Sequence, residues 1–160
     1  MSRFHFRKVT KRSQTALHVT GTALIFVSLM MLICSFVELS DNSSIYPLLI
    51  SSLICGFVGS VARLTTKPGA MGQAEIFSAV GSAYLFVSLF GTLPYLFAGT
   101  FDLGNSDSLI EFTDALFESI SGYTATGSTV FGSHNPIESH GTGTLLYRQL
   151  TQWLGGLGIV

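Results

Sequence analysis

The chain is 160 residues long, and its composition is 48% hydrophobic but only 11% charged. An ordinary soluble domain carries roughly 25% charged residues, so the composition argues against a soluble domain and indicates a membrane protein. The formal net charge of −1 says little about partners, because the distribution of charge along the chain decides how a membrane protein is oriented. Cys34 and Cys55 lie in apolar stretches and support neither a disulfide framework nor a metal site.

Three apolar stretches are long enough to cross a membrane as helices: residues 16–37, 45–62 and 76–98. A helix rises about 1.5 Å per residue and a hydrocarbon core is about 30 Å thick, so roughly 20 residues are needed. The first stretch is longer than the apolar core of a typical signal peptide, and we interpret it as a retained helix. Pro94 should kink the last turns of the third helix.

If the three stretches cross the membrane in turn, seven of the eight basic residues lie on the same side of the membrane. Five lie within residues 1–15, and Arg63 and Lys67 lie between the second and third stretches. Because Lys and Arg concentrate on the cytoplasmic side, the sequence predicts a cytoplasmic N-terminus and an outer location for residues 100–147. We interpret the N-terminal cluster as a flexible arm that obeys this topology rule, in preference to a nucleic-acid or lipid-binding segment.

On the outer side, the sequence predicts a helix over residues 108–120, capped by Ser106 or Ser108. Its apolar and acidic residues fall on opposite faces. The apolar face contains Leu109, Phe112, Leu116, Phe117 and Ile120, and the acidic face contains Glu111, Asp114 and Glu118. Such a helix is about 20 Å long, too short to cross a bilayer, and taken alone it would suit the outer membrane surface.

The segment that follows changes this interpretation. Residues 121–128, "SGYTATGS", are rich in glycine and hydroxyl groups, and after the polar residues 129–144 the chain turns apolar again over 145–160. Non-helical backbone at membrane depth is tolerated only where it lines a watery cavity or is buried in protein. A short helix, a polar loop and a second helix therefore predict the hairpin of a cation pore.

The residue types of this loop suit a potassium pore. Main-chain carbonyls can replace the water shell of a potassium ion without the tight grip of carboxylates. Gly127 can adopt the unusual dihedral angles that turn successive carbonyls toward one axis. The hydroxyls of Thr124, Thr126 and Ser128 can add oxygen ligands or bond back to the wall, and Gly122 would let the chain break from the helix.

Three stretches carry a family resemblance: "LFVSLFGTLPYLFAG" (85–99), "DALFESISGYTATGSTV" (114–130) and "LLYRQLTQWLGGLGIV" (145–160). On these motifs the chain resembles the N-terminal part of a TrkH-type bacterial potassium uptake protein of the Trk/Ktr/HKT cation transporter superfamily. The resemblance implies an all-α membrane protein in which the chain supplies the first of four pore repeats, the other three lying beyond it. It also implies a selectivity filter at residues 121–128.

The resemblance implies the following layout. Residues 1–15 form a basic cytoplasmic N-terminus, 16–67 hold two extra transmembrane helices, and 68–160 form the first pore repeat. Within that repeat the implied parts are the outer helix 76–98, the pore helix 108–120, the filter 121–128, the outer loop 129–144 and the start of the inner helix 145–160.

The implied ion ligands are the carbonyls of Thr124, Ala125, Thr126 and Gly127, with Ala125 and Thr126 as the central pair for potassium. Glu118, Gly122 and Ser128 support the filter. Alanine at 125 departs from the threonine often found there, which puts the packing of the filter in doubt but not the role of a backbone ligand.

By the same resemblance, the protein takes up potassium across the bacterial inner membrane, driven by the membrane potential, and is not an enzyme. The implied partners are membrane lipid, a second copy in a homodimer and a cytoplasmic nucleotide-binding ring subunit of the TrkA type. No nucleic acid and no bound cofactor are expected.

Several alternatives stay open at the level of sequence. The acidic face could draw cations to the outer mouth, but for Glu118 we favour hydrogen bonds to backbone N–H groups that hold the loop in shape. Arg148 could pair with one of these acids or extend toward the membrane interface. A membrane scaffold without a pore and a sodium-permeable relative are the rival functions; glycine at 127 favours potassium, because serine there accompanies sodium transport in some relatives.

Overall fold

The computed structural model describes residues 2–41, 43–69, 72–102, 107–132 and 136–157. These residues form helices and connecting loops, with no strand among them, so the predicted all-α class is confirmed. The elements are α1 (Ser2–Glu38), η1 (Leu39–Asp41), α2 (Tyr46–Thr65), α3 (Gln73–Phe90), α4 (Leu93–Phe97), α5 (Ser108–Tyr123), η2 (Ile137–Ser139) and α6 (Thr142–Leu157).

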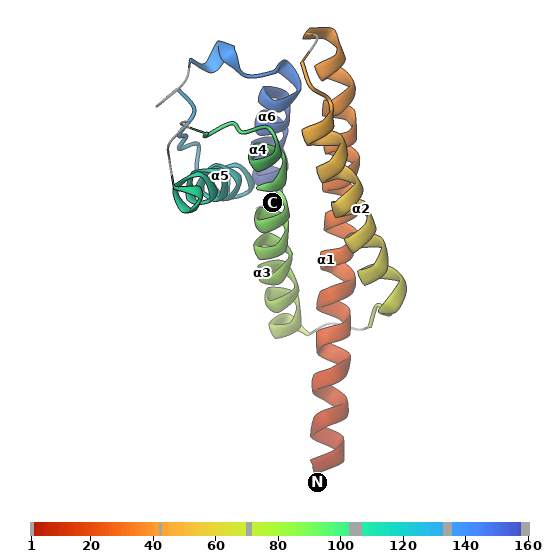
Figure 1. Cartoon of the computed structure of the whole chain (residues 1–160). Helices are drawn as coiled ribbons and strands as arrows, with labels where there is room; N and C mark the ends of the chain where they lie inside the picture. Colours follow the sequence, from red (N-terminus) through yellow and green to blue (C-terminus); the bar gives the residue numbers. More distant parts are fainter. Residues whose placement is uncertain (1, 42, 70–71, 103–106, 133–135, 158–160) are drawn as a thin grey trace.

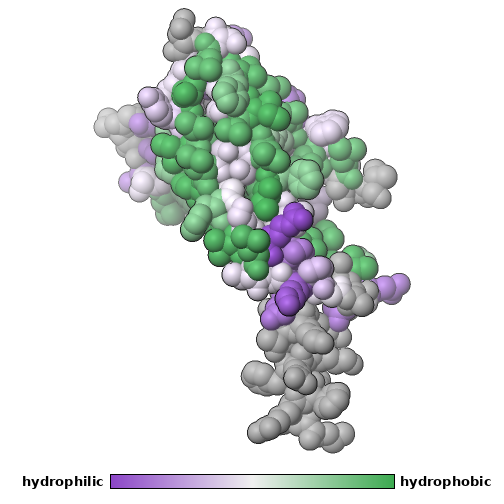
Figure 2. Space-filling view, turned by 90° about the vertical axis from the view of Figure 1, so that its right-hand side faces the viewer, coloured by the Kyte–Doolittle hydropathy of each residue, from purple (hydrophilic) through white to green (hydrophobic). Residues whose placement is uncertain are grey.

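The three predicted membrane spans are confirmed. Gln14–Glu38, Tyr46–Thr65 and Glu75–Phe97 are each long and apolar enough to cross a membrane. Many of their large hydrophobic side chains are exposed on the molecular surface, including Phe57 and Phe77. Figure 2 shows such residues gathered over one face of the helices, bordered below by hydrophilic residues. This is the surface of a multi-pass membrane protein.

The helix α1 extends well beyond its apolar part, because its backbone is helical from Ser2 onward. The expectation of a flexible arm over residues 1–15 is therefore wrong. No proline or glycine occurs before Gly21, so nothing in this segment ends the helix that the apolar part nucleates.

Small residues let α1 and α2 pack closely. A Cβ atom on Gly21 would lie 2.8 Å from the carbonyl oxygen of Gly59, so the two backbones meet at this crossing. Further along, the hydroxyls of Ser28 and Ser52 donate to each other's carbonyl oxygens at 2.8 and 2.9 Å. Such contacts are the usual means by which membrane helices associate, and they hold α1 closely against α2.

The third span is interrupted where the sequence predicted a kink. The helix α3 ends at Phe90, and α4 begins at Leu93 after a turn at Gly91 and Thr92. Pro94 has no N–H group to bond the carbonyl of Phe90, four residues before it, so the helical hydrogen-bond ladder is broken here. The carbonyl of Gly91 accepts a hydrogen bond from the hydroxyl of Tyr147 in α6, at 3.1 Å.

In Figure 1 the short helix α5 lies across the long helices, whereas α6 runs alongside them. The helix α5 follows Asp107 and ends at Tyr123, three residues beyond the predicted end. Asp107 thus takes the N-cap position for which Ser106 or Ser108 was predicted; Ser108 is the first helical residue and Ser106 lies outside the described residues. The helix α6 begins at Thr142, three residues before the predicted start.

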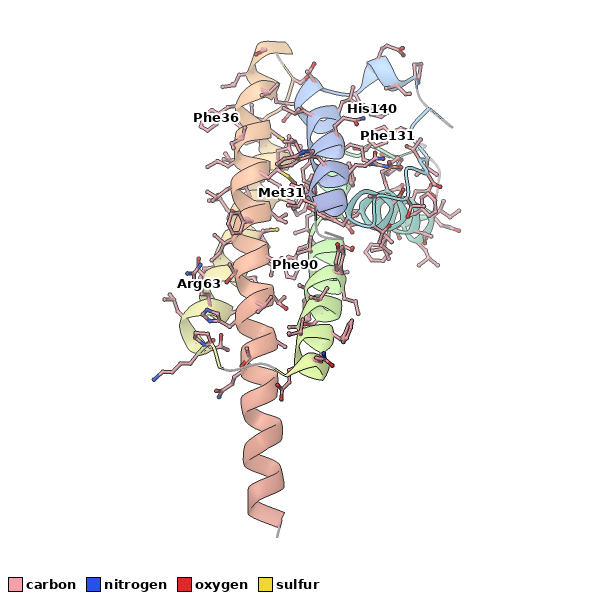
Figure 3. The ribbon with its side chains drawn as sticks, turned by 180° about the vertical axis from the view of Figure 1, so that it is seen from behind. Met31, Phe36, Arg63, Phe90, Phe131 and His140 are labelled. Atoms are coloured by element: carbon pink, nitrogen blue, oxygen red, sulfur yellow. The ribbon has the colours of Figure 1, made fainter. Side chains whose placement is uncertain are left out.

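The two ends of the helical bundle differ in their residues. The N-terminus of α1 and the connection between α2 and α3, which contains Lys67, lie at the lower end of Figure 1. Arg63 lies at the same end (Figure 3). The end of α1 and the start of α6 lie together at the opposite end, where Glu38 contacts Gly143.

Candidate functional site

The helix α5 packs inward through small and polar residues rather than through its apolar face. Its buried residues are Ala115, Glu118, Ser119, Ser121, Gly122 and Tyr123. The side chains of Leu109 and Phe117 are 73% and 45% exposed, whereas Glu118 is fully buried. The apolar face that the sequence defines therefore points away from the other described helices, and the side with Glu118 points toward them.

The end of α5 fits tightly between α3 and α6. A Cβ atom on Gly122 would lie 2.3 Å from the Thr151 hydroxyl oxygen, and one on Gly155 would lie 2.4 Å from the Tyr123 carbonyl oxygen. The hydroxyl of Ser119 donates to the carbonyl of Ser88 in α3, at 2.6 Å. The prediction that Gly122 breaks the helix is wrong: this glycine lies inside α5 and allows α6 to approach.

The chain leaves α5 through a left-handed turn at Ala125, whose φ angle is 53°. The N–H of Ala125 donates to the Gly122 carbonyl at 2.9 Å, and that of Thr126 donates to the Ser121 carbonyl at 3.0 Å. These two bonds form a Schellman motif, which usually places glycine at the left-handed position. Holding alanine there costs roughly 1–2 kcal/mol, so Ala125 is a strained residue among the predicted ion ligands.

The carbonyl oxygens of the four predicted ligands accept no hydrogen bond from the described part of the chain. The Thr124 hydroxyl instead donates to the Ile120 carbonyl at 2.7 Å and lies 2.7 Å from the Thr126 hydroxyl. Gly127 has a φ of 80°, in the region that favours glycine. Thr124, Thr126 and Gly127 are exposed in this chain.

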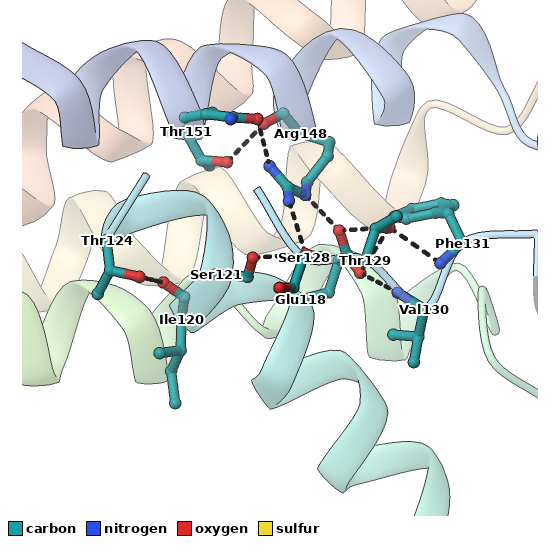
Figure 4. Close-up of polar contacts among 11 residues, drawn as sticks. Glu118, Ile120, Ser121, Thr124, Ser128, Thr129, Val130, Phe131, Arg148 and Thr151 are labelled. Atoms are coloured by element: carbon teal, nitrogen blue, oxygen red, sulfur yellow. Dashed lines mark hydrogen bonds and ion pairs between the residues drawn. The ribbon is translucent and has the colours of Figure 1, made fainter. Parts of the chain in front are cut away.

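Directly after these residues, the backbone is held by a buried carboxylate (Figure 4). The Thr129 hydroxyl donates to both oxygens of Glu118, at 2.9 and 3.0 Å, and the Val130 N–H donates to Oε2 at 2.8 Å. Arg148 of α6 donates to Oε1 through Nε. The carboxylate of Glu118 therefore links α5, the loop and α6, where it does not contact solvent.

Ser128 is held through its main chain rather than through its side chain. Its carbonyl oxygen accepts hydrogen bonds from Nη2 of Arg148, at 3.2 Å, and from the Ser121 hydroxyl. The Arg148 side chain is only 7% exposed, so it forms an ion pair inside the protein and does not extend to the membrane interface. The sequence missed Ser121 as an anchor.

Aromatic residues pack above this network. The rings of Phe131 and His140 meet edge to face, with centroids 4.9 Å apart (Figure 3). Partial burial lowers the pKa of the His140 imidazole below its ordinary value of 6.5. Burial therefore favours the neutral form of the His140 ring, which packs against Phe131.

No side-chain metal centre is present among the described residues: no three His, Cys, Asp or Glu residues are placed to hold a metal ion. The predicted ligands are instead the main-chain carbonyls of residues 124–127, which accept no backbone hydrogen bond from the described residues. Such uncharged oxygens suit a weakly held monovalent cation.

Two curated relatives and one solved structure resemble the chain over long stretches. The Trk system potassium uptake protein TrkH from Halomonas elongata is 39% identical over 61% of this chain and 17% of its own length. The protein of the same name from Escherichia coli is 29% identical over 98% of this chain and 29% of its own length. The crystal structure of the potassium transporter TrkH from Vibrio parahaemolyticus superposes with a TM-score of 0.74 at 27% identity, over 91% of this chain and 30% of that one. No protein-family model matches the chain.

These relatives are transporters rather than enzymes by name, and the resemblance to TrkH-type proteins inferred from the motifs is confirmed in both sequence and fold. Where nearly the whole of this chain is matched, it covers only about 30% of the relative's length.

Proposed function

Because the chain is similar to TrkH-type potassium uptake proteins along almost its whole length, we propose that it forms the N-terminal helices and the first pore repeat of a potassium uptake transporter. In this assignment α1 and α2 are the extra helices. The outer helix is α3 with α4, the pore helix is α5, residues 124–128 form the filter strand, and α6 is the inner helix. Three further repeats complete the pore.

The observation that carries the proposal is the depth at which α5 ends. Tyr123 packs against Gly155, thirteen residues into α6, which is about 20 Å along that helix. It also packs against Gly91, eighteen residues after the start of α3. Gly91 lies within the third span, Glu75–Phe97, six residues before its end, so the polar, non-helical tract after Tyr123 begins at membrane depth, where it requires either burial in protein or a watery cavity.

The tract supplies oxygens suited to potassium. Potassium is the transported ion, and the carbonyls of Thr124, Ala125, Thr126 and Gly127 replace its water shell as it passes. The N–H groups of Ala125 and Thr126 bond the last turn of α5, and the carbonyls of residues 124–127 accept no hydrogen bond from the described residues, so these carbonyls are available to the ion. Glu118 and Arg148 fix the far end of the tract through Ser128 and the residues after it.

Transport needs no chemical step. One elementary charge that crosses 100 mV gains about 2.3 kcal/mol, which drives potassium inward when the cell interior is negative. In the proposed orientation, the protein lies in the bacterial inner membrane. The end of the bundle with Arg63 and Lys67 faces the cytoplasm, following the positive-inside rule. A homodimer and a cytoplasmic nucleotide-binding ring subunit are the proposed partners, in line with relatives named as parts of a Trk system.

The test is potassium uptake by a potassium-uptake-deficient bacterium that carries the complete gene for this chain. We expect the wild type to restore growth at low potassium and Gly127→Asp to abolish uptake at equal expression. Gly132→Asp is the matched control, because Gly132 has the same φ of 80° but lies outside the tract. A wild type that takes up only sodium would overturn the proposed selectivity for potassium. Equal uptake by Gly127→Asp and Gly132→Asp would overturn the proposal that residues 124–128 line a pore.

A further inference from the structure

The carboxylate of Glu38 occupies the first turn of α6, although Glu38 ends α1 and is more than a hundred residues away in the sequence. Its Oε2 accepts a hydrogen bond from the Gly143 N–H, and its Oε1 accepts one from the Thr144 hydroxyl at 3.0 Å. Glu38 is only 4% exposed. No ion pair to Glu38 occurs among the described residues, so two hydrogen bonds and the positive end of the α6 dipole compensate its charge.

Two glycines make room for this carboxylate. A Cβ atom on Gly141 would lie 2.3 Å from a Glu38 carboxylate oxygen, and one on Gly143 would lie 2.7 Å from the other oxygen. The same Cβ atom on Gly143 would lie 2.4 Å from the carbonyl oxygen of Cys34, so α6 begins directly against the backbone of α1. The contact is thus shaped from both sides and belongs to the fold of α1 against α6.

The capped turn leads directly to the residues that hold the filter strand. Thr144 and Arg148 are four residues apart and lie on the same buried face of α6. Arg148 bonds Glu118 and the Ser128 carbonyl. A shift of α6 along its axis would therefore displace the guanidinium from both partners at once.

We propose that Glu38 is a positioning residue for the pore. By capping α6, Glu38 fixes the position of that helix along its axis and thereby the position at which Arg148 contacts Glu118 and Ser128. The helix α1 therefore has a role in the geometry of the filter. The inference rests on the proposed function, since only a pore gives the position of Ser128 a consequence for ion passage.

The test compares Glu38→Ala with Glu138→Ala in the complete protein. Glu138 is an exposed acid of the outer loop and serves as the matched control. Hydrogen exchange by mass spectrometry reads two segments: residues 142–147 of α6 and the loop residues 128–132. We expect Glu38→Ala to speed exchange about tenfold in both segments, because loss of a charged cap amounts to about one factor of ten in local opening. Glu138→Ala should change neither segment.

Uptake gives the second reading. We expect Glu38→Ala to raise the half-saturating potassium concentration and to increase inhibition by sodium, which a loss of folded protein alone would not do. If Glu38→Ala yields no folded protein, Glu38→Gln is used, because its amide oxygen still accepts one of the two hydrogen bonds. Faster exchange confined to residues 142–147, with unchanged sodium inhibition, would reduce Glu38 to a local cap and overturn the proposal. If the wild type takes up no potassium, the proposed function is wrong whatever the exchange experiment shows. Hydrogen exchange of residues 128–132 then decides by itself whether Glu38 positions the loop.

Discussion

Replacing Arg148 with glutamine removes the positive charge that pairs with buried Glu118 and ends the side chain at the position of the arginine Nε. Removing one partner of a buried ion pair destabilises a protein by roughly 3–5 kcal/mol, because the other charge stays buried without compensation. The Glu118 carboxylate retains its hydrogen bonds from Thr129 and Val130, so we expect the lower end of that range, about 3 kcal/mol. Arg63→Gln, which removes an exposed charge at the other end of the bundle, should change stability by less than about 0.5 kcal/mol.

The assay is equilibrium unfolding of the purified protein in detergent, followed by the loss of helical circular dichroism. Glu118→Gln is measured alone and together with Arg148→Gln. Because the two side chains contact each other, the double variant should be more stable than the summed single effects predict, by roughly 1–3 kcal/mol. Purely additive effects, or an Arg148→Gln protein as stable as Arg63→Gln, would refute the claim that this pair holds the loop.

Three further outcomes follow from local geometry. Ala125→Gly should stabilise the folded protein by about 1 kcal/mol in the same unfolding assay, because glycine adopts the left-handed conformation without strain; an unchanged or lower stability would contradict the Schellman geometry. Gly122→Ala should destabilise the contact between α5 and α6, and adding Thr151→Ala should restore part of the loss; no rescue would mean that the clash lies elsewhere. Since the folded-state pKa of His140 is lowered, its contribution to stability is complete above pH 6.5 and is lost as the pH falls through the folded-state value. His140→Gln should flatten this acid-side decrease, and an unchanged pH profile would contradict the burial of the imidazole.

The long elements could be predicted from the sequence because their signals are simple. An apolar run of about twenty residues has few alternatives to a membrane helix, and a proline in such a run marks an interruption, as Pro94 does. The residues at which these helices begin and end were harder to predict. The helix α1 continues to Ser2 because nothing stops it, a property that hydropathy does not report.

The site was predicted as a segment but not in its local geometry. The sequence favoured Gly122 as the point where the chain leaves the helix, since glycine tolerates left-handed angles, yet tertiary contact with Thr151 requires that glycine inside the helix. The left-handed position falls instead on Ala125. Hydrogen bonds from distant residues, such as those that Ser121 and Arg148 make to the Ser128 carbonyl, leave no periodic trace in a sequence.

The ion ligands themselves are tested most directly by locating the ion. Anomalous diffraction from crystals of the complete protein grown with rubidium in place of potassium would reveal each site that accepts a cation of similar size. We expect peaks beside the carbonyl oxygens of Ala125 and Thr126, and their loss in Gly127→Asp. Rubidium bound elsewhere in the protein with no peak beside residues 124–127 would contradict the assignment of this tract as a filter strand.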